Sequence, residues 1–168
     1  MRKVIVAGVA LLAMVVAPAW FIAPTSAASA SVTVRNSYNY YCLDQLHDTA
    51  GQPTTTVRMI ADCRGEIGRQ WTFQQSGATF KVVNSRSGWC LSAPENSGSK
   101  VFAEVCVPGV AKQLWGVTLT SYGHNLLAVQ TPGRGCLYLR TATDLAVTPN
   151  SQPEFCDGYQ SWFNWHWS

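Results

Sequence analysis

Residues 36–44 read NSYNYYCLD, and residues 84–92 read NSRSGWCLS. In both stretches Asn-Ser stands the same distance before Cys-Leu. A third version, QTPGRGCLYL, occupies residues 130–139. The Cys-Leu pairs recur at nearly equal intervals, at Cys42, Cys90 and Cys136. Self-similarity of this kind predicts a fold assembled from copies of one supersecondary unit.

Each Cys-Leu pair is followed by a second cysteine and then by a tryptophan in a similar tripeptide. The second cysteines are Cys63, Cys106 and Cys156. The tripeptides are RQW at 69–71, QLW at 113–115 and QSW at 160–162. We therefore expect three repeats, at about residues 32–80, 81–127 and 128–168, in which Trp71, Trp115 and Trp162 fill a shared core.

The local sequence predicts strands. The runs 32–43, 78–85, 114–121 and 125–131 are rich in β-branched and aromatic residues, and Gly, Pro, Asn and Ser punctuate the chain between them. No stretch after residue 30 keeps a helical period for three turns. Three units of several short strands predict an all-β fold, a closed barrel with threefold pseudosymmetry.

The first thirty residues differ from the rest. Arg2 and Lys3 precede the uncharged run 4–23, and small residues follow it. This order is typical of a secretory signal peptide, with cleavage expected after Ala27 or Ala30. An uncleaved membrane anchor is the alternative, because the apolar run is about as long as a bilayer-spanning helix. We expect residues 31–168 to be one secreted domain.

The part from Ser31 onward carries ten Lys and Arg and nine Asp and Glu, a net charge of +1. Nucleic-acid binding requires a basic stripe, so we expect no such partner. This part holds all six cysteines, and an even count in an exported chain predicts disulfides. The simplest pairing lies within each repeat: Cys42–Cys63, Cys90–Cys106 and Cys136–Cys156.

No metal, cofactor or enzymatic activity is expected. The chain has no C-x-x-C pair, and its three histidines are scattered, which argues against a zinc site. No Ser/His/acid or Cys/His arrangement stands out. The nine acids show no spacing that suggests the carboxylate pair of a glycoside hydrolase.

The three ordered tripeptides make residues 32–167 resemble the ricin B-type lectin family, whose domains are β-trefoils with three Q-x-W repeats. The first tripeptide departs from the motif, since Arg69 stands where the family has glutamine. The resemblance implies binding of sugars, typically of galactose or xylose type, in a shallow pocket on each repeat. There a carboxylate accepts paired hydrogen bonds from hydroxyls, an aromatic ring stacks on the sugar, and an amide closes the pocket.

In the family the acid follows Cys-Leu, the aromatic lies two residues before the second cysteine, and Asn-Gln precedes the tryptophan. In the first repeat Asp44 keeps the acid position, but Ala61 takes the aromatic position, and Gly68 and Arg69 replace Asn-Gln. The other repeats lack the acid. At the acid, aromatic and asparagine positions they carry Ser92, Glu104 and Lys112, and Tyr138, Glu154 and Tyr159.

The candidate carbohydrate site therefore lies in the first repeat, at Asp44, Arg58, Arg69 and Gln70. The arginines would supply donors, and a tyrosine from YNYY at 38–41 would supply the stacking face. Two plainer interpretations stay open. Asp44 caps a turn, and Arg69 forms a surface ion pair with Asp44 or Glu66.

The C-terminal stretch WFNWHWS at 162–168 alternates aromatic residues, so a strand there would place Phe163, Trp165 and Trp167 on one face. This strand closes the barrel against the N-terminal strand, or it presents an aromatic patch to a glycan or protein partner.

The sequence thus favours a secreted, non-catalytic carbohydrate-binding module whose sugar sites are partly eroded, with a glycan or polysaccharide as partner and no membrane contact after signal cleavage. The first alternative is a β-trefoil that has lost sugar binding and binds a protein, as a toxin-delivery subunit or an inhibitor. The second is a cell-wall protein tethered by an uncleaved signal.

Cleavage of the predicted signal peptide is directly testable. Expressed in a secreting host, the chain is expected in the medium with Ala28 or Ser31 as its first residue. Edman sequencing or intact mass of the exported protein checks this. An intact Met1 on membrane-bound protein would instead support the anchor.

Overall fold

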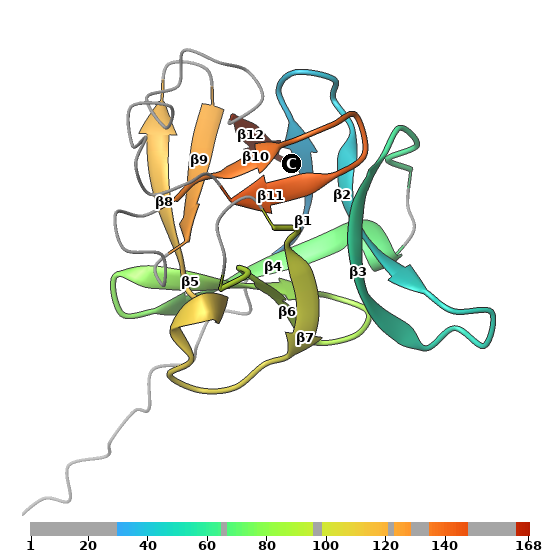
Figure 1. The fold of residues 1–168 in the computed structure, drawn as a ribbon, viewed down its shortest axis with the longest axis horizontal. Helices are drawn as coiled ribbons and strands as arrows, with labels where there is room; N and C mark the ends of the chain where they lie inside the picture. Colours follow the sequence, from blue (N-terminus) through green and yellow to red (C-terminus); the bar gives the residue numbers. More distant parts are fainter. Residues whose placement is uncertain (1–29, 65–66, 96–98, 121–122, 129–134, 148–163) are drawn as a thin grey trace, which may run out of the picture.

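The computed structural model describes residues 30–64, 67–95, 99–120, 123–128, 135–147 and 164–168. Within them lie twelve strands and two single-turn 3₁₀ helices, so the all-β prediction is confirmed (Figure 1). The strands are β1 (Ser31–Asn36), β2 (Cys42–His47), β3 (Pro53–Ile60), β4 (Gln70–Ser76), β5 (Thr79–Asn84), β6 (Trp89–Ser92), β7 (Phe102–Val105), β8 (Trp115–Thr120), β9 (Gly123–Ala128), β10 (Leu137–Leu139), β11 (Leu145–Val147) and β12 (Trp165–Trp167). The 3₁₀ helices are η1 (Ile67–Arg69) and η2 (Ala111–Gln113). In the residues that the structure describes, no helix has the length and apolar character needed to cross a bilayer.

Antiparallel pairing closes part of the sheet into a barrel. β1 pairs with β12 on one side and with β4 on the other. The circle is completed through the pairs β12–β9, β9–β8, β8–β5 and β5–β4. Closure satisfies strand edges that would otherwise be exposed. The last strand therefore has the barrel-closing role that the sequence left open, with Val34 of β1 opposite Trp167.

The remaining strands form three antiparallel hairpins, β2–β3, β6–β7 and β10–β11. β2 also pairs with β1, and β6 with β5, so these two hairpins continue from barrel strands. A single register pair, Thr56 with Phe102, joins β3 to β7. In Figure 1 the β10–β11 hairpin lies next to the β2–β3 hairpin. Of the candidate site residues, Asp44 and Arg58 lie on the β2–β3 hairpin, whereas Arg69 lies in η1 and Gln70 lies in β4.

Three fully buried tryptophans bind the hairpins to the barrel. The indole N–H of Trp71 donates to the carbonyl of Leu43 at 3.0 Å, and that of Trp115 donates to Leu91 at 2.9 Å. The third bond joins Trp165 to the carbonyl of Leu137 at 3.2 Å. A buried indole N–H needs such an acceptor.

The third tryptophan predicted for this set, Trp162, lies outside the described residues. Among the described residues Trp165 makes the third bond of this kind. Trp165 stands as far behind Leu137 as Trp71 stands behind Leu43. The Q-x-W motif does not take account of this distance in sequence between the leucine and the tryptophan.

Two of the predicted disulfides are present, Cys42–Cys63 and Cys90–Cys106. Each closes a short loop and stabilises the fold by roughly 3 kcal/mol in the chain-entropy model. The predicted bond between Cys136 and Cys156 lies outside the described residues, since Cys156 is not described.

The turns that precede β2 and β6 share one backbone design. The N–H of Tyr40 donates to the carbonyl of Asn36, and the N–H of Gly88 donates to Asn84, both at 2.9 Å. Both residues have left-handed backbone angles, with φ of 60° at Tyr40 and 72° at Gly88. Glycine adopts this conformation freely, whereas a residue with a Cβ loses roughly 1–2 kcal/mol.

Replacing Trp115 by phenylalanine tests the tryptophan anchors. The change deletes the buried N–H and leaves the Leu91 carbonyl without this donor. We expect the free energy of unfolding, measured in urea, to fall by about 2–4 kcal/mol. Trp167→Phe is the matched control, because Trp167 is only partly buried and should cost less. Equal losses in the two variants would contradict an anchoring role for the hydrogen bond.

Candidate functional site

Asp44 is a strand residue whose carboxylate is buried. It lies in β2 opposite Arg58 of β3, and Arg58 Nε donates to its Oδ2 at 3.2 Å. The Asp44 side chain is 8% exposed, whereas that of Arg58 is 42% exposed. The turn-cap interpretation is therefore wrong. Asp44 is the inner half of a cross-strand ion pair whose outer half is available to a ligand.

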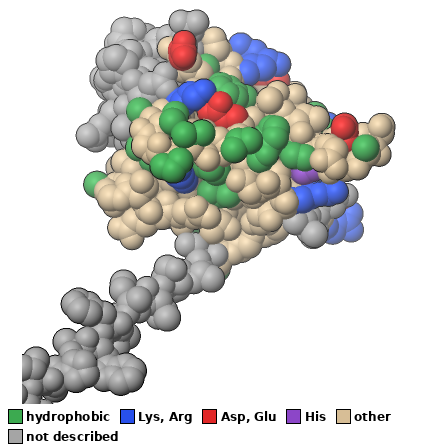
Figure 2. Space-filling view, turned by 90° about the horizontal axis from the view of Figure 1, so that it is seen from below, with side chains coloured by type: hydrophobic (Ala, Val, Ile, Leu, Met, Phe, Trp, Pro, Cys, Tyr) green, Lys and Arg blue, Asp and Glu red, His purple; other side chains and the backbone are tan. Residues whose placement is uncertain are grey.

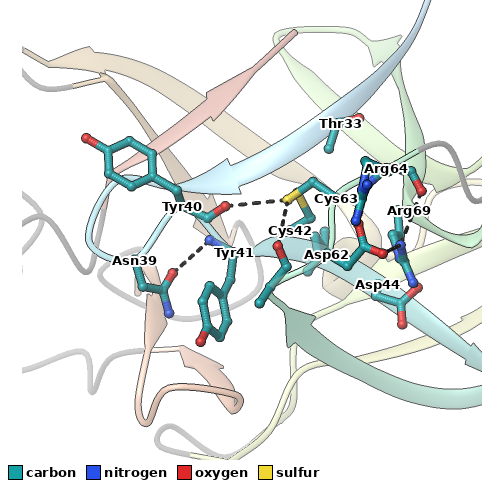
Figure 3. The surroundings of a disulfide bond; sticks show 12 residues. Thr33, Asn39, Tyr40, Tyr41, Cys42, Asp44, Asp62, Cys63, Arg64 and Arg69 are labelled. Carbon is teal, nitrogen blue, oxygen red and sulfur yellow. Dashed lines mark hydrogen bonds and ion pairs between the residues drawn. A yellow bond between two sulfur atoms is a disulfide. The ribbon is translucent and has the colours of Figure 1, made fainter.

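Arg69 lies on the other side of the same carboxylate. Its Nε is 3.9 Å from Asp44 Oδ1, and its side chain is only 7% exposed. Its Nη1 donates to the Arg64 carbonyl at 3.3 Å and lies 3.9 Å from the Asp62 carboxylate. The expected ion pair with Asp44 is therefore present, but it is not on the surface, because the guanidinium is buried beside the Cys42–Cys63 disulfide (Figure 3). Glu66 lies outside the described residues.

Glycine at position 68 lets η1 lie close to β2. A Cβ on Gly68 would stand 3.4 Å from Asp44 Oδ1 and 3.3 Å from the carbonyl oxygen of Gln45. The contact with the carboxylate is an ordinary one and that with the carbonyl is slightly tight, so a side chain here would need a small shift of η1 or β2. Gly68, at the family's asparagine position, therefore suits the close packing of η1 on β2.

Gln70 does not join this cluster. Its side-chain amide donates to the Thr33 hydroxyl at 2.8 Å, across the barrel pair β4–β1. The structure therefore brings together three of the four candidate residues, Asp44, Arg58 and Arg69.

Arg58 borders two hollows. The smaller one, of about 160 Å³, is polar and includes Asp44, His47 and Arg86 in its lining. His47 Nδ1 is 3.0 Å from the Gln45 carbonyl oxygen, and its Nε2 is buried without a hydrogen-bond partner among the described residues. The lining of this hollow therefore includes a histidine whose Nε2 makes no hydrogen bond to the described residues.

The larger space, of about 500 Å³, is named here the Arg58 hollow. It is lined by Tyr41, Thr56, Arg58, Met59, Ile60, Ala61, Thr143 and Asp144. The N–H of Met59 donates to the Thr143 carbonyl at 3.0 Å, which joins β3 to the 141–144 turn. The lining combines an aromatic ring, a guanidinium, a carboxylate and two hydroxyls, a set that suits a ligand with both hydroxyls and an apolar face.

Asp144 is held as a charged acceptor. Lys100 Nζ donates to its Oδ1 at 3.0 Å, and Arg140 Nη2 donates to its Oδ2 at 3.3 Å. The hydrogen bond from Lys100 is the main cause that holds the pKa of Asp144 below its ordinary value of 3.8. Burial opposes it, and the bond from Arg140 adds to the lowering. Sequence reasoning missed Asp144, because only the fold brings the 141–144 turn beside β3.

The second repeat has an acid of its own on the neighbouring strand. Glu104 of β7 accepts hydrogen bonds from Ser92 at 2.7 Å, from Gln113 at 2.9 Å and from Lys112 at 2.9 Å. Burial raises the pKa of Glu104, but these three donors outweigh it, and the pKa lies below the ordinary 4.5. Lys112 also stands 5.3 Å from the centre of the Phe102 ring.

The sequence analysis did not predict this hydrogen-bond network around Glu104, and this is its main omission. Ser92, Glu104 and Lys112 stood out only as departures from the family pattern. Their types are complementary, a hydroxyl, a carboxylate and an ammonium, and that was the available signal. In the third repeat Tyr138 lies in β10, whereas Glu154 and Tyr159 lie outside the described residues.

One face of the molecule is chemically mixed. Figure 2 shows hydrophobic, acidic and basic side chains next to one another on one face of the molecule. Over the described part of the chain, no three His, Cys, Asp or Glu side chains come close enough to hold a metal ion.

Comparison with known proteins gives one family match. The model of the ricin-type beta-trefoil lectin domain matches residues 30–162. No curated protein matches the sequence significantly.

Solved structures resemble this chain at low sequence identity. ThreeFoil, a designed 3-fold symmetric protein, is similar with a TM-score of 0.66 and 15% identity, over 82% of this chain and 96% of that one. SeviL, solved bound to asialo-GM1 saccharide, has a TM-score of 0.59 and 12% identity, over 83% and 97%. A mosquitocidal holotoxin has a TM-score of 0.66 and 16% identity, but the match spans 83% of this chain and only 17% of the toxin. These likenesses concern the fold.

The depressed pKa of Glu104 predicts a pH-dependent contribution to stability. A carboxylate with a lowered folded-state pKa stabilises the fold above its unfolded pKa, and this stabilisation is lost as pH falls through the folded value. Glu104→Gln should therefore lower the melting temperature at pH 7, and the difference from wild type should shrink well below pH 4.5. Scanning calorimetry across pH 2–7 checks this, with the exposed Glu95→Gln as control. A difference that does not change with pH would refute the charge-based role.

Proposed function

We propose that this chain, which belongs to the ricin-type β-trefoil lectin domain family, is a secreted carbohydrate-binding module that takes a sugar unit at the Arg58 hollow and acts by binding alone. One observation carries the proposal. A buried carboxylate, Asp44, fixes one edge of an exposed guanidinium beside an aromatic ring.

Asp44 acts indirectly in this proposal. Both of its oxygens face arginines, at 3.2 Å for Arg58 and 3.9 Å for Arg69, so a sugar does not need to reach the carboxylate. Arg58 uses Nε for Asp44, and a guanidinium has further N–H donors in a fixed plane. Because one edge is already held, less side-chain entropy is lost when the other edge binds a hydroxyl.

The stacking face moves from β3 to the turn before β2. Ala61 stands where the family has its aromatic residue, and it lines the Arg58 hollow. Tyr41 borders the same hollow and supplies an aromatic ring. Removal of the family's ring thus leaves a space that Tyr41 bounds. Together with Ile60, Tyr41 offers the apolar surface on which a sugar ring packs.

Asp144 supplies the missing acceptor. Its carboxylate is fixed by Lys100 and Arg140 and lines the hollow with Arg58. Neutral sugar hydroxyls both donate and accept, so they can use Asp144 and Arg58 together. The ligand class we propose is a neutral sugar, of the galactose or xylose type by family.

The other repeats fit the proposal of partly eroded sites. In the second repeat Glu104 already accepts three hydrogen bonds, of about four that a carboxylate can accept. Asp144 accepts two, from Lys100 and Arg140, and so keeps more acceptor capacity. Export of the chain after signal cleavage is consistent with the disulfides, which form in oxidising compartments. A single shallow site implies weak affinity, about millimolar to micromolar. Useful retention on a target would then come from clustered ligands.

Binding to a panel of neutral glycans and polysaccharides tests the proposal. Wild type should bind, and Arg58→Gln should weaken that binding by about tenfold or more, because a guanidinium hydrogen bond is worth roughly 1.5–3 kcal/mol. Arg64→Gln is the control, since Arg64 is 94% exposed and does not line the hollow. Calorimetry or affinity electrophoresis gives the readout.

Asp44→Asn separates the indirect role from a direct one. It should weaken glycan binding less than Arg58→Gln and also lower stability, because Arg69 loses a buried counter-charge. Unchanged binding in Arg58→Gln would move the site elsewhere. A wild type that binds no glycan would contradict the carbohydrate function and favour a β-trefoil that binds a protein.

A further inference from the structure

The turn between β1 and β2 presents aromatic rings to solvent. Tyr38 is 58% exposed and Tyr40 is 68% exposed, while the adjacent Tyr41 borders the Arg58 hollow. An exposed ring on its own needs no explanation. Tyr40 is different, because its backbone is strained.

The matched turn of the second repeat shows what this backbone prefers. Gly88 occupies the equivalent place, with φ of 72° and the same 2.9 Å bond from its N–H to the preceding asparagine carbonyl. The disulfide sulfur of Cys106 lies 3.2 Å from the Gly88 carbonyl oxygen, as that of Cys63 lies 3.5 Å from the Tyr40 carbonyl oxygen. Glycine therefore satisfies every backbone contact of this turn.

Tyrosine at position 40 thus has a steric cost without a gain in burial. Its φ of 60° is uncommon for a residue with a Cβ, and most of its ring faces water. Strained residues of this kind cluster at binding sites, and the inference runs from the observed outlier to function. The side chain of Tyr40 is the part of this turn that the fold does not require.

The turn is attached to the wall of the Arg58 hollow. The Asn39 side chain donates to the Ala142 carbonyl at 3.3 Å and accepts from the Tyr41 N–H at 3.0 Å. Thr143 and Asp144, next along from Ala142, line the hollow. Figure 3 shows the rings of Tyr40 and Tyr41 pointing in different directions from neighbouring backbone positions. A single sugar cannot stack on both, whereas a chain that leaves the hollow across the turn can.

We propose that Tyr40 forms a second sugar subsite beside the Arg58 hollow, so that the ligand is an oligosaccharide or polysaccharide rather than one terminal sugar. This inference rests on the proposed function. Tyrosine suits the role, because a large ring with few rotatable bonds binds at low entropic cost. Tyr38 is a second exposed ring on the same turn.

The test is the dependence of affinity on chain length. The exported chain is titrated calorimetrically with two neutral series, xylose to xylohexaose and galactose to β-1,4-galactohexaose. For the series that binds, affinity in wild type should rise about tenfold between one and four units, a gain of the size expected from one stacked ring. Tyr40→Gly should remove that rise and leave the affinity for the monosaccharide unchanged.

Tyr40→Gly should also stabilise the protein. Relief of the left-handed backbone predicts a melting temperature higher by about 3 °C, so lost affinity cannot be blamed on unfolding. Leu119→Ser is the matched control, because Leu119 is 74% exposed on β8 and should leave the length dependence intact.

Each outcome decides. A rise with chain length that survives Tyr40→Gly overturns the subsite. So does a lower melting temperature of that variant, since the tyrosine would then be structural. Monosaccharide binding that is lost in Arg58→Gln but never rises with length overturns the subsite and supports the proposed function. No binding at any length in either series overturns both.

Discussion

The structure depends on three buried hydrogen bonds between an indole N–H and a leucine carbonyl. Each joins the strand that contains the leucine of a Cys-Leu pair to a barrel strand, through Trp71, Trp115 or Trp165. The tryptophans supply core volume and the bonds fix the height of each hairpin over the barrel. Because each tryptophan bonds to a backbone carbonyl, it constrains the backbone of β2, β6 and β10 and not the side chains on their outward face. Side chains on the outward side are free to change while the scaffold persists.

The outward positions show how a binding surface changes on a fixed scaffold. In the first repeat the acid stays on β2 and is neutralised by Arg58 and Arg69. In the second repeat the acid lies on β7, and Lys112 and Ser92 compensate it. A part-buried carboxylate is costly without donors, so the loss of a ligand-binding residue forces its neighbours to change together. Both repeats therefore end with an internal charge network, though with different partners.

The sequence predicted features that repeat in register and missed those that depend on contacts between repeats. The spacing of the cysteines predicted the two described disulfides, because each closes within one repeat. The threefold repetition of the motif predicted the closed barrel. The motif did not indicate Trp165, although Trp165 satisfies the spacing seen in the first repeat. Burial of Asp44 between two arginines depends on how η1 packs beside β2, which no local pattern reveals. Asp144 lies near β3 only because the fold brings the 141–144 turn against that strand.

The difference between the two networks favours the first repeat as the proposed site. Glu104 and Lys112 are 27% and 29% exposed and already bonded to each other, so a sugar there must exchange one hydrogen bond for another. Such exchanges yield little net free energy. Arg58 is 42% exposed on a side chain whose inner edge is held by a carboxylate of 8% exposure. A sugar at Arg58 replaces water on donors that face solvent and leaves the internal pair intact. An ion pair of this kind is thus structural where its two side chains are about equally exposed. It can bind a ligand where one side chain is buried and the other is exposed.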